Sequence, residues 1–465
     1  MATDPTRPTV PFRDAFRFWL KLGFINFGGP TGQIAIMHQE LVDKRKWISE
    51  RRFLHALNYC MLLPGPEAQQ LAVYVGWLLH RTLGGLIAGI FFVLPGAALM
   101  LALSWSYAVH GNVAWVAATF YGLRAAVIAI VAIAVLRIGS KALKNRVMVL
   151  IAAASFVAIF LFKAPFPAIV VGAGVVGLVG GRWWPRWFAV SAGHGGGAAS
   201  GAVLHDDEPP PAHARPGLWR LIRCVALGVT LWLGPLLLIA WWERSRGGSS
   251  GSGASGVLEQ EAIFFSKCAM VTFGGAYAVL AYISQAAVET FHWMLAPQML
   301  DGLGLAESTP GPLILVTQFV GFLGAHKNAN GLSPALMGVL GTLVTLWATF
   351  APCFLWIFAG APFIEQMRGQ KALNAALSTI TASVVGVVLN LSVWLGLQTL
   401  FRHTEERRGL GMVVLTPDVA TVDLFALLLA VAAFVGMRKW KWGIIPVVLG
   451  GAALGLGWRL LGPAS

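Results

Sequence analysis

The sequence predicts an all-α, polytopic membrane protein built from two inverted-topology repeats that contain broken or re-entrant helices. Of its 465 residues, 57% are hydrophobic and only 12% are charged, whereas charged residues make up about a quarter of a soluble domain. Nine apolar segments recur, and five of them reach the roughly 18 residues that a membrane span requires. The segments are Leu83–Tyr107, Val113–Val135, Val147–Phe162, Ala168–Gly180, Val225–Trp242, Leu332–Ala359, Ala372–Leu400, Val422–Met437 and Ile444–Trp458.

The second observation is an internal duplication. The stretch Lys21–Pro66 contains KLGFINFGGP and LLPGP, and the second half contains KCAMVTFGG at Lys267–Gly275 and STPGP at Ser308–Pro312. Four unlike landmarks are each separated by 246 positions: Lys21 and Lys267, Gly28 and Gly274, Trp47 and Trp293, Pro64 and Pro310. A shared offset without gaps indicates repetition, and paired helix-breaking segments are typical of secondary transporters.

The elements of the first repeat follow from its residues. A helix from Phe12 should break at Gly28-Gly29, and Pro30 suits the first turn of the next helix because no N–H is needed there. That helix should end at Lys44–Lys46, whose cations complement the negative C-terminal end of the helix dipole. Trp47 follows, a residue typical of the bilayer surface.

A second apolar segment, Phe53–Leu63, should stop at Pro64-Gly65-Pro66, and a new helix is expected from Glu67 to Leu79. Four full spans follow. The second repeat has the same order with an 11-residue insertion after the PGP helix, because Pro352 and Pro95 are 257 rather than 246 positions apart.

We divide the chain into four parts: 1–190, the first repeat; 191–216, a flexible Gly-, Ala- and Pro-rich linker; 217–257, a connecting transmembrane helix and a Gly/Ser linker; and 258–465, the second repeat. Such low-complexity composition is typical of flexible linkers. If each repeat crosses the bilayer an even number of times, the lone span Val225–Trp242 inverts the second copy. Inverted copies give the pseudo-two-fold plan of many transporters.

Basic residues favour one arrangement of the broken segments. If the GGP and PGP segments are re-entrant hairpins, Lys44–Arg52 lies on the cytoplasmic face with most other basic loops, as the positive-inside rule requires. Arg402–Arg408 falls outside in either arrangement. The hairpin interpretation gives nine full spans plus four hairpins, and the alternative gives thirteen spans. We expect the N-terminus in the cytoplasm.

Several function classes are disfavoured. The net charge of +14 does not indicate nucleic-acid binding, because no basic face or aromatic stacking platform accompanies it. The four cysteines lack CxxC spacing, so neither a zinc site nor a disulfide framework is implied. The cluster His205–Glu208 lies in a linker, and we interpret it as a solvated acidic patch rather than a metal site. We expect no cofactor, no metal and no enzymatic activity, since HExxH and acyl-transfer motifs are absent from the sequence.

The breaks are the candidate site. After a break, the next helix presents free N–H groups that carry about half a positive charge, which makes the terminus an anion site. Four such termini follow Gly29, Pro66, Gly275 and Pro312, and inversion would aim them at one central point. The competing interpretation is that these motifs only kink spans or permit tight packing, but repetition in register favours a site.

Three cations lie in apolar stretches. Lys21 and Lys267 precede each Gly-Gly by one or two helical turns, and an ammonium group at membrane depth costs about 2.5 kcal/mol or more unless it lines a pathway or finds a partner. Snorkelling to the interface is the alternative for Lys21, which lies near Arg17, whereas Lys267 has no basic neighbour and is expected to be buried. Arg124 has no counterpart in the second repeat and carries less weight.

Polar side chains flank both PGP motifs. Glu67, Gln69 and Gln70 follow the first, and Glu307, Ser308 and Thr309 precede the second. They are candidates to bind substrate oxygen atoms, and Glu67 and Glu307 are candidate proton carriers. The alternatives are a helix-start role for Glu67, countering the dipole, and a solvated loop position for Glu307. Weaker candidates are Asp301, His55, His38 and Glu40.

The chain resembles the chromate ion transporter family, in its long form with two tandem domains, through FGGPTGQIAIMHQELVDKRKWISERRFLHALNYCMLLPGPEAQQLAVYVG and STPGPLILVTQFVGF. The resemblance implies a bacterial inner-membrane protein that exports chromate and confers resistance to it, with sulfate as the physiological mimic. The family pattern falls on Gly28, Gly29, Pro30, Pro64, Gly65, Pro66, Glu67, Gly274, Gly275, Glu307, Pro310, Gly311 and Pro312. Ala276 stands where the first repeat has Pro30, so the two tips need not match in shape.

We therefore expect a secondary transporter in which helix N-termini, Lys21 and Lys267 bind a tetrahedral dianion and the repeats rock for alternating access. The expected partners are chromate, sulfate and the lipid bilayer, with a homodimer left open. The alternatives are an exchanger or channel for another inorganic anion and, from a different class, a membrane-embedded enzyme. The coupling ion also stays open at this point.

Overall fold

The computed structural model describes residues 10–27, 29–61, 63–111, 113–188, 203, 217–246, 256–273, 276–329, 331–363, 371–409 and 412–461. Three predicted site residues, Gly28, Gly274 and Gly275, lie outside the described residues. The His205–Glu208 cluster and nearly all of both predicted linkers also lie outside them.

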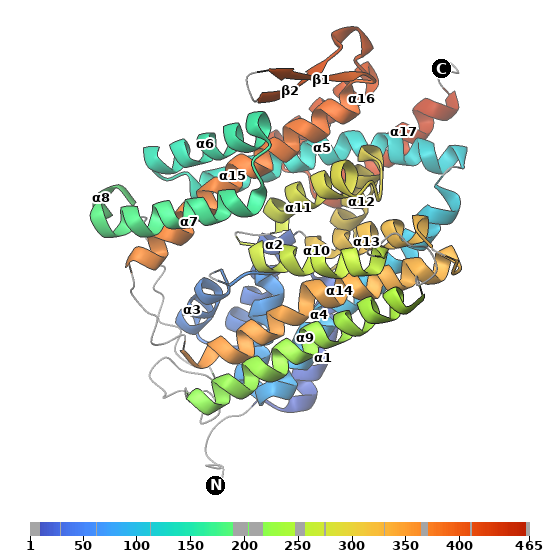
Figure 1. Ribbon diagram of the computed structural model, residues 1–465. Coiled ribbons are helices and arrows are strands. Elements are labelled where there is room, and N and C mark those ends of the chain that lie inside the picture. The colour runs from blue at the N-terminus through green and yellow to red at the C-terminus, as the bar shows by residue number, and fades with distance from the viewer. Residues whose placement is uncertain are drawn as a thin grey trace.

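The order of helices repeats along the chain (Figure 1). The first repeat contains α1 (Phe12–Ile25), α2 (Gly29–His38), α3 (Glu50–Cys60), α4 (Glu67–His110), α5 (Ala114–Ala142), α6 (Arg146–Phe162), α7 (Phe166–Trp183) and α8 (Pro185–Phe188). The connecting helix is α9 (Leu218–Arg246). The second repeat contains α10 (Val257–Val271), α11 (Ala276–Gln285), α12 (Ala296–Ser308), α13 (Val316–Lys327), α14 (Pro334–Gly360), α15 (Lys371–Leu400), α16 (Leu424–Lys439) and α17 (Ile444–Leu461).

The predicted helix boundaries at the breaks are confirmed. Helix α1 ends at Ile25 and α2 begins at Gly29, while α4 begins at Glu67 directly after the first PGP motif. The backbone of α4 leaves helical geometry at His80 and Arg81, which separates the expected short helix from the following span. The two parts of α4 therefore correspond to α13 and α14, and α5–α7 correspond to α15–α17.

The duplication extends to details of the backbone. Both second helices, α2 and α11, run into a π-helical turn, at Gln39–Lys44 and Ala286–Thr290. Positive φ angles follow at equivalent positions, 52° at Lys46 and 53° at His292. Short π-helical segments of this kind occur frequently at functional sites, and here they precede Trp47 and Trp293. Both tryptophans are buried, so Trp47 packs inside the protein and does not face the bilayer surface as expected.

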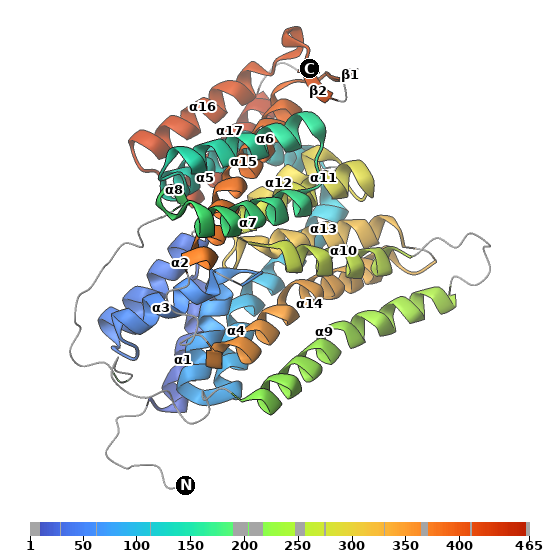
Figure 2. The same ribbon diagram turned by 60° about the vertical axis from the view of Figure 1, so that its left-hand side comes forward.

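The helices form two lobes (Figures 1 and 2). The six-helix lobe consists of α5–α7 and α15–α17, and the broken-helix lobe consists of α1–α4, α10, α13 and α14, with α11 and α12 between them. In the six-helix lobe, α15 packs on α6 and α7 while α5 packs on α16 and α17. This exchange of equivalent contacts is the mark of a two-fold relation. The direction of that axis in the membrane, and so the inversion, stays a prediction.

Glycines allow the exchanged helices to approach closely. A methyl group on Gly122 of α5 would lie 2.0 Å from the Gly451 carbonyl oxygen of α17. On the equivalent contact, a methyl group on Gly177 of α7 would lie 2.5 Å from Ala376 Cα of α15. Small residues at such crossings let backbones meet, which is how membrane helices gain packing energy.

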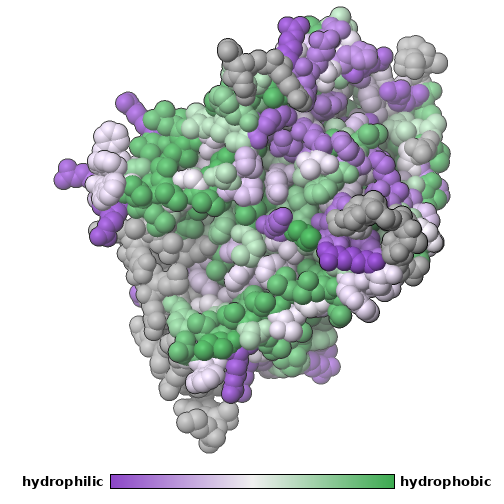
Figure 3. Space-filling model, in the orientation of Figure 1, coloured by the Kyte–Doolittle hydropathy of each residue, from purple (hydrophilic) through white to green (hydrophobic). Residues whose placement is uncertain are grey.

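Membrane-crossing helices are present on both lobes. Six described helices are long and apolar enough to cross a membrane, and three shorter apolar helices accompany them, so neither predicted total of spans is established. Helices α3 and α12 have 11 and 13 residues, which corresponds to about 17 and 20 Å. That is shorter than the roughly 30 Å hydrocarbon core and favours the hairpin interpretation. Hydrophobic surface covers α9 and α14 below and α6 and α7 above (Figure 3).

A short β-hairpin, which the sequence prediction did not include, follows α15. Strands β1 (Thr404–Gly409) and β2 (Met412–Pro417) pair antiparallel, with Thr404 opposite Pro417. The run MVVLTP is rich in residues that favour strands. No strand was predicted there because the segments on both sides have a helical pattern. The hairpin carries hydrophilic surface (Figure 3), and the all-α fold class is otherwise confirmed.

Helix α9 depends on a side chain of α14. Pro235 lies inside α9 and has no N–H, so the carbonyl of Leu231 loses its helical donor. The indole Nε1–H of Trp347 donates to that carbonyl at 2.9 Å. A freed backbone group at membrane depth needs such a donor.

We predict that Trp347→Phe lowers the free energy of unfolding by about 1–3 kcal/mol, because it leaves the Leu231 carbonyl unpaired. In a Pro235→Ala background, the backbone N–H gained at position 235 can donate to the Leu231 carbonyl. Trp347→Phe should then lower the free energy of unfolding by less. Thermal unfolding of the purified protein in detergent measures this double-mutant cycle. Equal losses in both backgrounds would contradict the assigned role of Trp347.

Candidate functional site

The flanks of the helix breaks meet through two equivalent hydrogen bonds. The N–H of Gly311 donates to the carbonyl of Asn26 at 3.2 Å, and the N–H of Gly65 donates to the carbonyl of Thr272 at 2.8 Å. The 246-residue offset equates Asn26 with Thr272 and Gly65 with Gly311. Each bond therefore joins the residue two before one repeat's Gly-Gly to the centre of the other repeat's PGP motif. The two repeats satisfy each other's broken backbone.

The side chain of Gln33 adds hydrogen bonds to this junction, the place where the broken segments of the two repeats meet. Its side-chain Nε2 donates to the Asn26 carbonyl at 3.0 Å and to the Gly311 carbonyl at 2.6 Å. The Asn26 amide in turn donates to the Phe92 carbonyl of α4 at 3.1 Å. Neither Asn26 nor Gln33 was predicted as a site residue. The available signal was a polar side chain on each side of the first Gly-Gly-Pro.

Helices α4 and α14 cross the PGP turns at close range. A methyl group on Gly65, whose φ is +125°, would lie 2.7 Å from Cys353 Sγ of α14. A methyl group on Gly96 of α4 would lie 2.1 Å from the carbonyl oxygen of Pro310. Gly96 and Cys353 are equivalent under the 257-residue offset, so each repeat's long helix supports the other repeat's turn.

Polar groups with unused bonding capacity collect at these breaks. Glu67, Gln69 and Gln70, at the start of α4, are all buried, and Gln70 Nε2 donates to the Pro64 carbonyl at 2.8 Å. Among the described residues, both side-chain polar atoms of Gln69 lack a hydrogen-bond partner, as do the amide oxygens of Asn26 and Gln33. Buried polar atoms are nearly always paired in proteins, so this cluster is suited to a polar ligand.

Two buried glutamates flank the breaks. Glu307 lies in the last turn of α12 in the protein interior, which excludes a solvated loop position, and it accepts a hydrogen bond from the Tyr277 hydroxyl. The charge of Arg137 acts on Glu307, and that of Lys141 acts on Glu67. Because the two cations are four residues apart, they share one face of α5. Neither cation was predicted as a site residue.

The remaining residues of the second PGP region are arranged differently from the first. The Ser308 hydroxyl donates to the Leu305 carbonyl at 2.9 Å, and the Thr309 hydroxyl donates to the Ala306 carbonyl at 3.1 Å. Both hydroxyls are therefore occupied within their own helix. After Pro312, a 3₁₀ turn at Leu313–Leu315 precedes α13, whereas α4 begins without one.

Lys21 and Lys267 lie on exposed faces of α1 and α10. The predicted burial of Lys267 is therefore wrong. The prediction failed because apolar neighbours in the sequence do not show which face of a helix a residue occupies. Both lysines precede the Asn26 and Thr272 carbonyls by five residues, so they lie near the breaks along the chain.

Arg124 has a partner far away in sequence. Its Nε donates to Asp301 Oδ1 at 2.7 Å and its Nη2 to Oδ2 at 2.8 Å, and the Tyr107 hydroxyl donates to Oδ2 at 2.7 Å. Asp301 is fully buried. This bidentate pair, which joins α5 to α12, neutralises both charges. Arg124 and Asp301 thus form an interhelical connection and are not part of the junction at the breaks.

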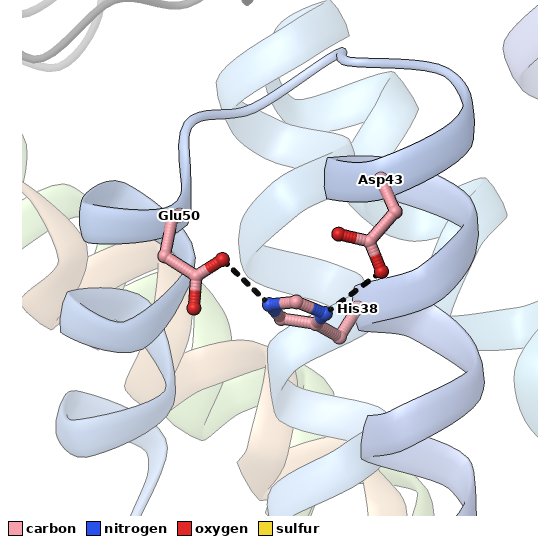
Figure 4. Close-up of side chains that lie close together, drawn as sticks. All are labelled: His38, Asp43 and Glu50. Atoms are coloured by element: carbon pink, nitrogen blue, oxygen red, sulfur yellow. Dashed lines mark hydrogen bonds and ion pairs between the residues drawn. The ribbon is translucent and has the colours of Figure 1, made fainter. Parts of the chain in front are cut away.

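His38 lies between two carboxylates (Figure 4). Its Nδ1 is 3.4 Å from Asp43 Oδ2 and its Nε2 is 3.0 Å from Glu50 Oε2. These three side chains could present one ligand atom each to a metal ion. We interpret the set as a connection between α3 and the segment that follows α2, where Glu40 also pairs with Lys44 at 2.7 Å. His55 lies on α3.

We predict that Gly311→Ala lowers the free energy of unfolding by about 1–3 kcal/mol, because a side chain is strained at its φ of +103°. As a control, Gly234→Ala in α9 meets nothing within 4 Å and should be neutral or stabilising by up to about 1 kcal/mol. Thermal unfolding in detergent compares the two. A Gly311 variant as stable as the Gly234 variant would refute the constrained junction.

Comparison with known proteins agrees with these features. Residues 13–178 and 260–456 match the profile of a family described as Chromate transporter. A chromate transport protein of Cupriavidus metallidurans is 26% identical, over 97% of this chain and 93% of its own length. A chromate transport protein of Pseudomonas aeruginosa is 33% identical, over 83% of this chain and 82% of its own. A probable chromate transport protein of Synechococcus elongatus is 28% identical, over 93% and 97% respectively. No solved structure matches.

Proposed function

The chain belongs to the chromate transporter family, and on that premise we propose that it is a secondary transporter that exports chromate across the bacterial inner membrane and so confers resistance to chromate. The multi-pass architecture and the paired helix breaks support this proposal. The observation that carries it is the reciprocal bonding of Gly65 to Thr272 and Gly311 to Asn26, which brings the broken segments of the two repeats together, and we propose that free N–H groups of the adjoining helices bind the anion.

The proposed substrate path uses three kinds of group. Free N–H groups of the first helical turns and the unpaired side-chain Nε2 of Gln69 donate to the oxygen atoms of a tetrahedral dianion. Lys21 and Lys267, exposed near the breaks, add positive charge. Arg137 and Lys141 attract the anion toward the junction, because fixed cations in a cleft raise the local concentration of an oppositely charged substrate. Sulfate, which has the same shape and charge, is the expected competitor.

The membrane potential is sufficient to drive export. A dianion gains about 4.6 kcal/mol per 100 mV of inside-negative potential, from about 2.3 kcal/mol per charge. At about 1.4 kcal/mol per decade, that supports an outward gradient of more than three decades. Proton exchange through Glu67 or Glu307 is not needed for direction, so we propose potential-driven transport as the simplest mechanism.

The test is chromate flux in proteoliposomes at imposed potentials and pH gradients. Potential-driven export predicts that about 30 mV balances each tenfold chromate gradient, a ratio that follows from the two energies above, with saturable kinetics and competition by sulfate. Flux that ignores the potential but follows the pH gradient would instead assign the coupling to protons. Absence of saturable chromate flux, with flux of another anion, would contradict the proposed substrate.

An asymmetry between the repeats supports alternating access. Helix α12 packs on α5, α15 and α17 of the six-helix lobe, whereas its counterpart α3 makes its main contacts with α4. In a second state, each repeat would adopt the arrangement that the other has here. Helix α3 would then pack on α15, as α12 packs on α5 in this structure. In that state the counterparts of Asp301 and Arg124, which are His55 and Thr381 by the two offsets, approach each other.

We predict that His55→Cys with Thr381→Cys forms a disulfide during turnover and that the disulfide abolishes chromate flux. The control pair is Val127→Cys with Gly304→Cys. A side chain on Gly304 would lie 3.0 Å from Val127 Cγ2, so this pair should crosslink the state described here. Chromate flux, measured before and after reduction of the disulfide, tests both cysteine pairs. If only the control pair crosslinks and flux continues, rocking of the repeats is contradicted.

A further inference from the structure

A cavity lies between α4, α9 and α14. Its volume is about 630 Å³. The residues that line it are almost all apolar, with Arg220 and Thr82 as exceptions. Helix α9 lies at the outside of the molecule beside α14 in both views (Figures 1 and 2), so this groove is on the side that faces lipid.

The contacts between the helices along the groove show that its charged residue, Arg220, lies at one end. Gly85 of α4 meets Phe358 of α14, and Gly228 of α9 meets Leu355 of α14, while further along Trp347 bonds to Leu231. Helix α9 therefore runs antiparallel to α14, and Arg220, two turns before Gly228, lies at the end near Phe358. The other end is apolar.

The guanidinium of Arg220 is held in place. It lies over the ring of Trp77, 5.4 Å from the centroid, and both residues line the cavity. Cation–π stacking leaves the guanidinium edge free to donate, and that planar edge matches a phosphate group through paired hydrogen bonds. From Arg220 to Trp232, the groove follows 12 residues of α9, or about 18 Å.

We propose that this groove is a binding site for one anionic phospholipid, with its phosphate on Arg220 and an acyl chain along α4, α9 and α14. Basic pockets between transmembrane helices bind anionic head groups in this manner. The groove's length exceeds the roughly 15 Å of one leaflet's hydrocarbon, which suits an extended acyl chain. One end recognises a charge and the remainder is a hydrophobic channel, so the site is complementary to an amphiphile.

Other occupants fit less well. Chromate would lose its hydration in an apolar channel with one cation, which is costly for a dianion. The proposed lipid would fill the space between α9 and the long helices of both repeats, and so hold the connecting helix to the broken-helix lobe. The whole of α9 lies in the interval between the two family-matched regions.

The test is native mass spectrometry of the full-length chain in detergent, with phosphatidylglycerol or phosphatidylcholine of identical acyl chains. We expect one phosphatidylglycerol retained in preference to phosphatidylcholine, and at least a tenfold loss of that preference in Arg220→Gln. The matched control is Arg223→Gln, one turn along the same helix. Arg223 is exposed and not among the residues that line the cavity, so its variant should behave as the unmodified protein.

A second variant keeps the test decisive. Cys224→Trp fills the apolar channel and should reduce retention of both lipids while Arg220 is intact. Equal retention of the two lipids by the unmodified chain would overturn the charge recognition. Equal effects of Arg220→Gln and Arg223→Gln would show a general surface attraction and overturn the site. A co-purified protein in place of lipid would also overturn it.

Discussion

The structure depends on one constraint: polar backbone that is broken at membrane depth must find hydrogen-bond partners inside the protein. Each repeat breaks its chain twice, and neither supplies all the partners itself. The Gly65 and Gly311 N–H groups instead reach carbonyls of the opposite repeat. This architecture therefore requires that two repeats meet, because one repeat alone would leave these groups unpaired. The same requirement gathers the breaks in one place and so creates the site.

Packing around the junction follows from that arrangement. Long helices cross the turns so closely that Gly96 leaves no room for a side chain beside the Pro310 carbonyl. The polar and charged side chains discussed above are of two kinds. Arg124 and Asp301, and the His38 set, have partners and connect helices. Gln69, at the start of α4, is buried, and among the described residues its side-chain Nε2 has no hydrogen-bond partner, so it can donate to a translocated oxyanion.

Much of this could be predicted from the sequence, for identifiable reasons. Gly and Pro act locally on the backbone, so the ends of α1 and the starts of α2 and α4 followed directly from their positions. The constant offset established which residues are equivalent, and the motifs identified the family. The sequence did not show which side of a helix faces the junction. For that reason Lys267 was expected to be buried and Gln33 was overlooked. Partners separated by long stretches of chain, such as Arg124 and Asp301, were also missed because no local pattern links them.

The central claim is that the joined breaks hold the transported dianion. Chromium scatters anomalously, so diffraction from crystals grown with chromate can locate the bound ion without bias from the protein atoms. The account predicts a single strong peak at the junction, within hydrogen-bond distance of N–H groups at the starts of α2, α4, α11 or the 3₁₀ turn before α13. A chromate peak elsewhere in the molecule, with the junction closed by backbone alone, would contradict it.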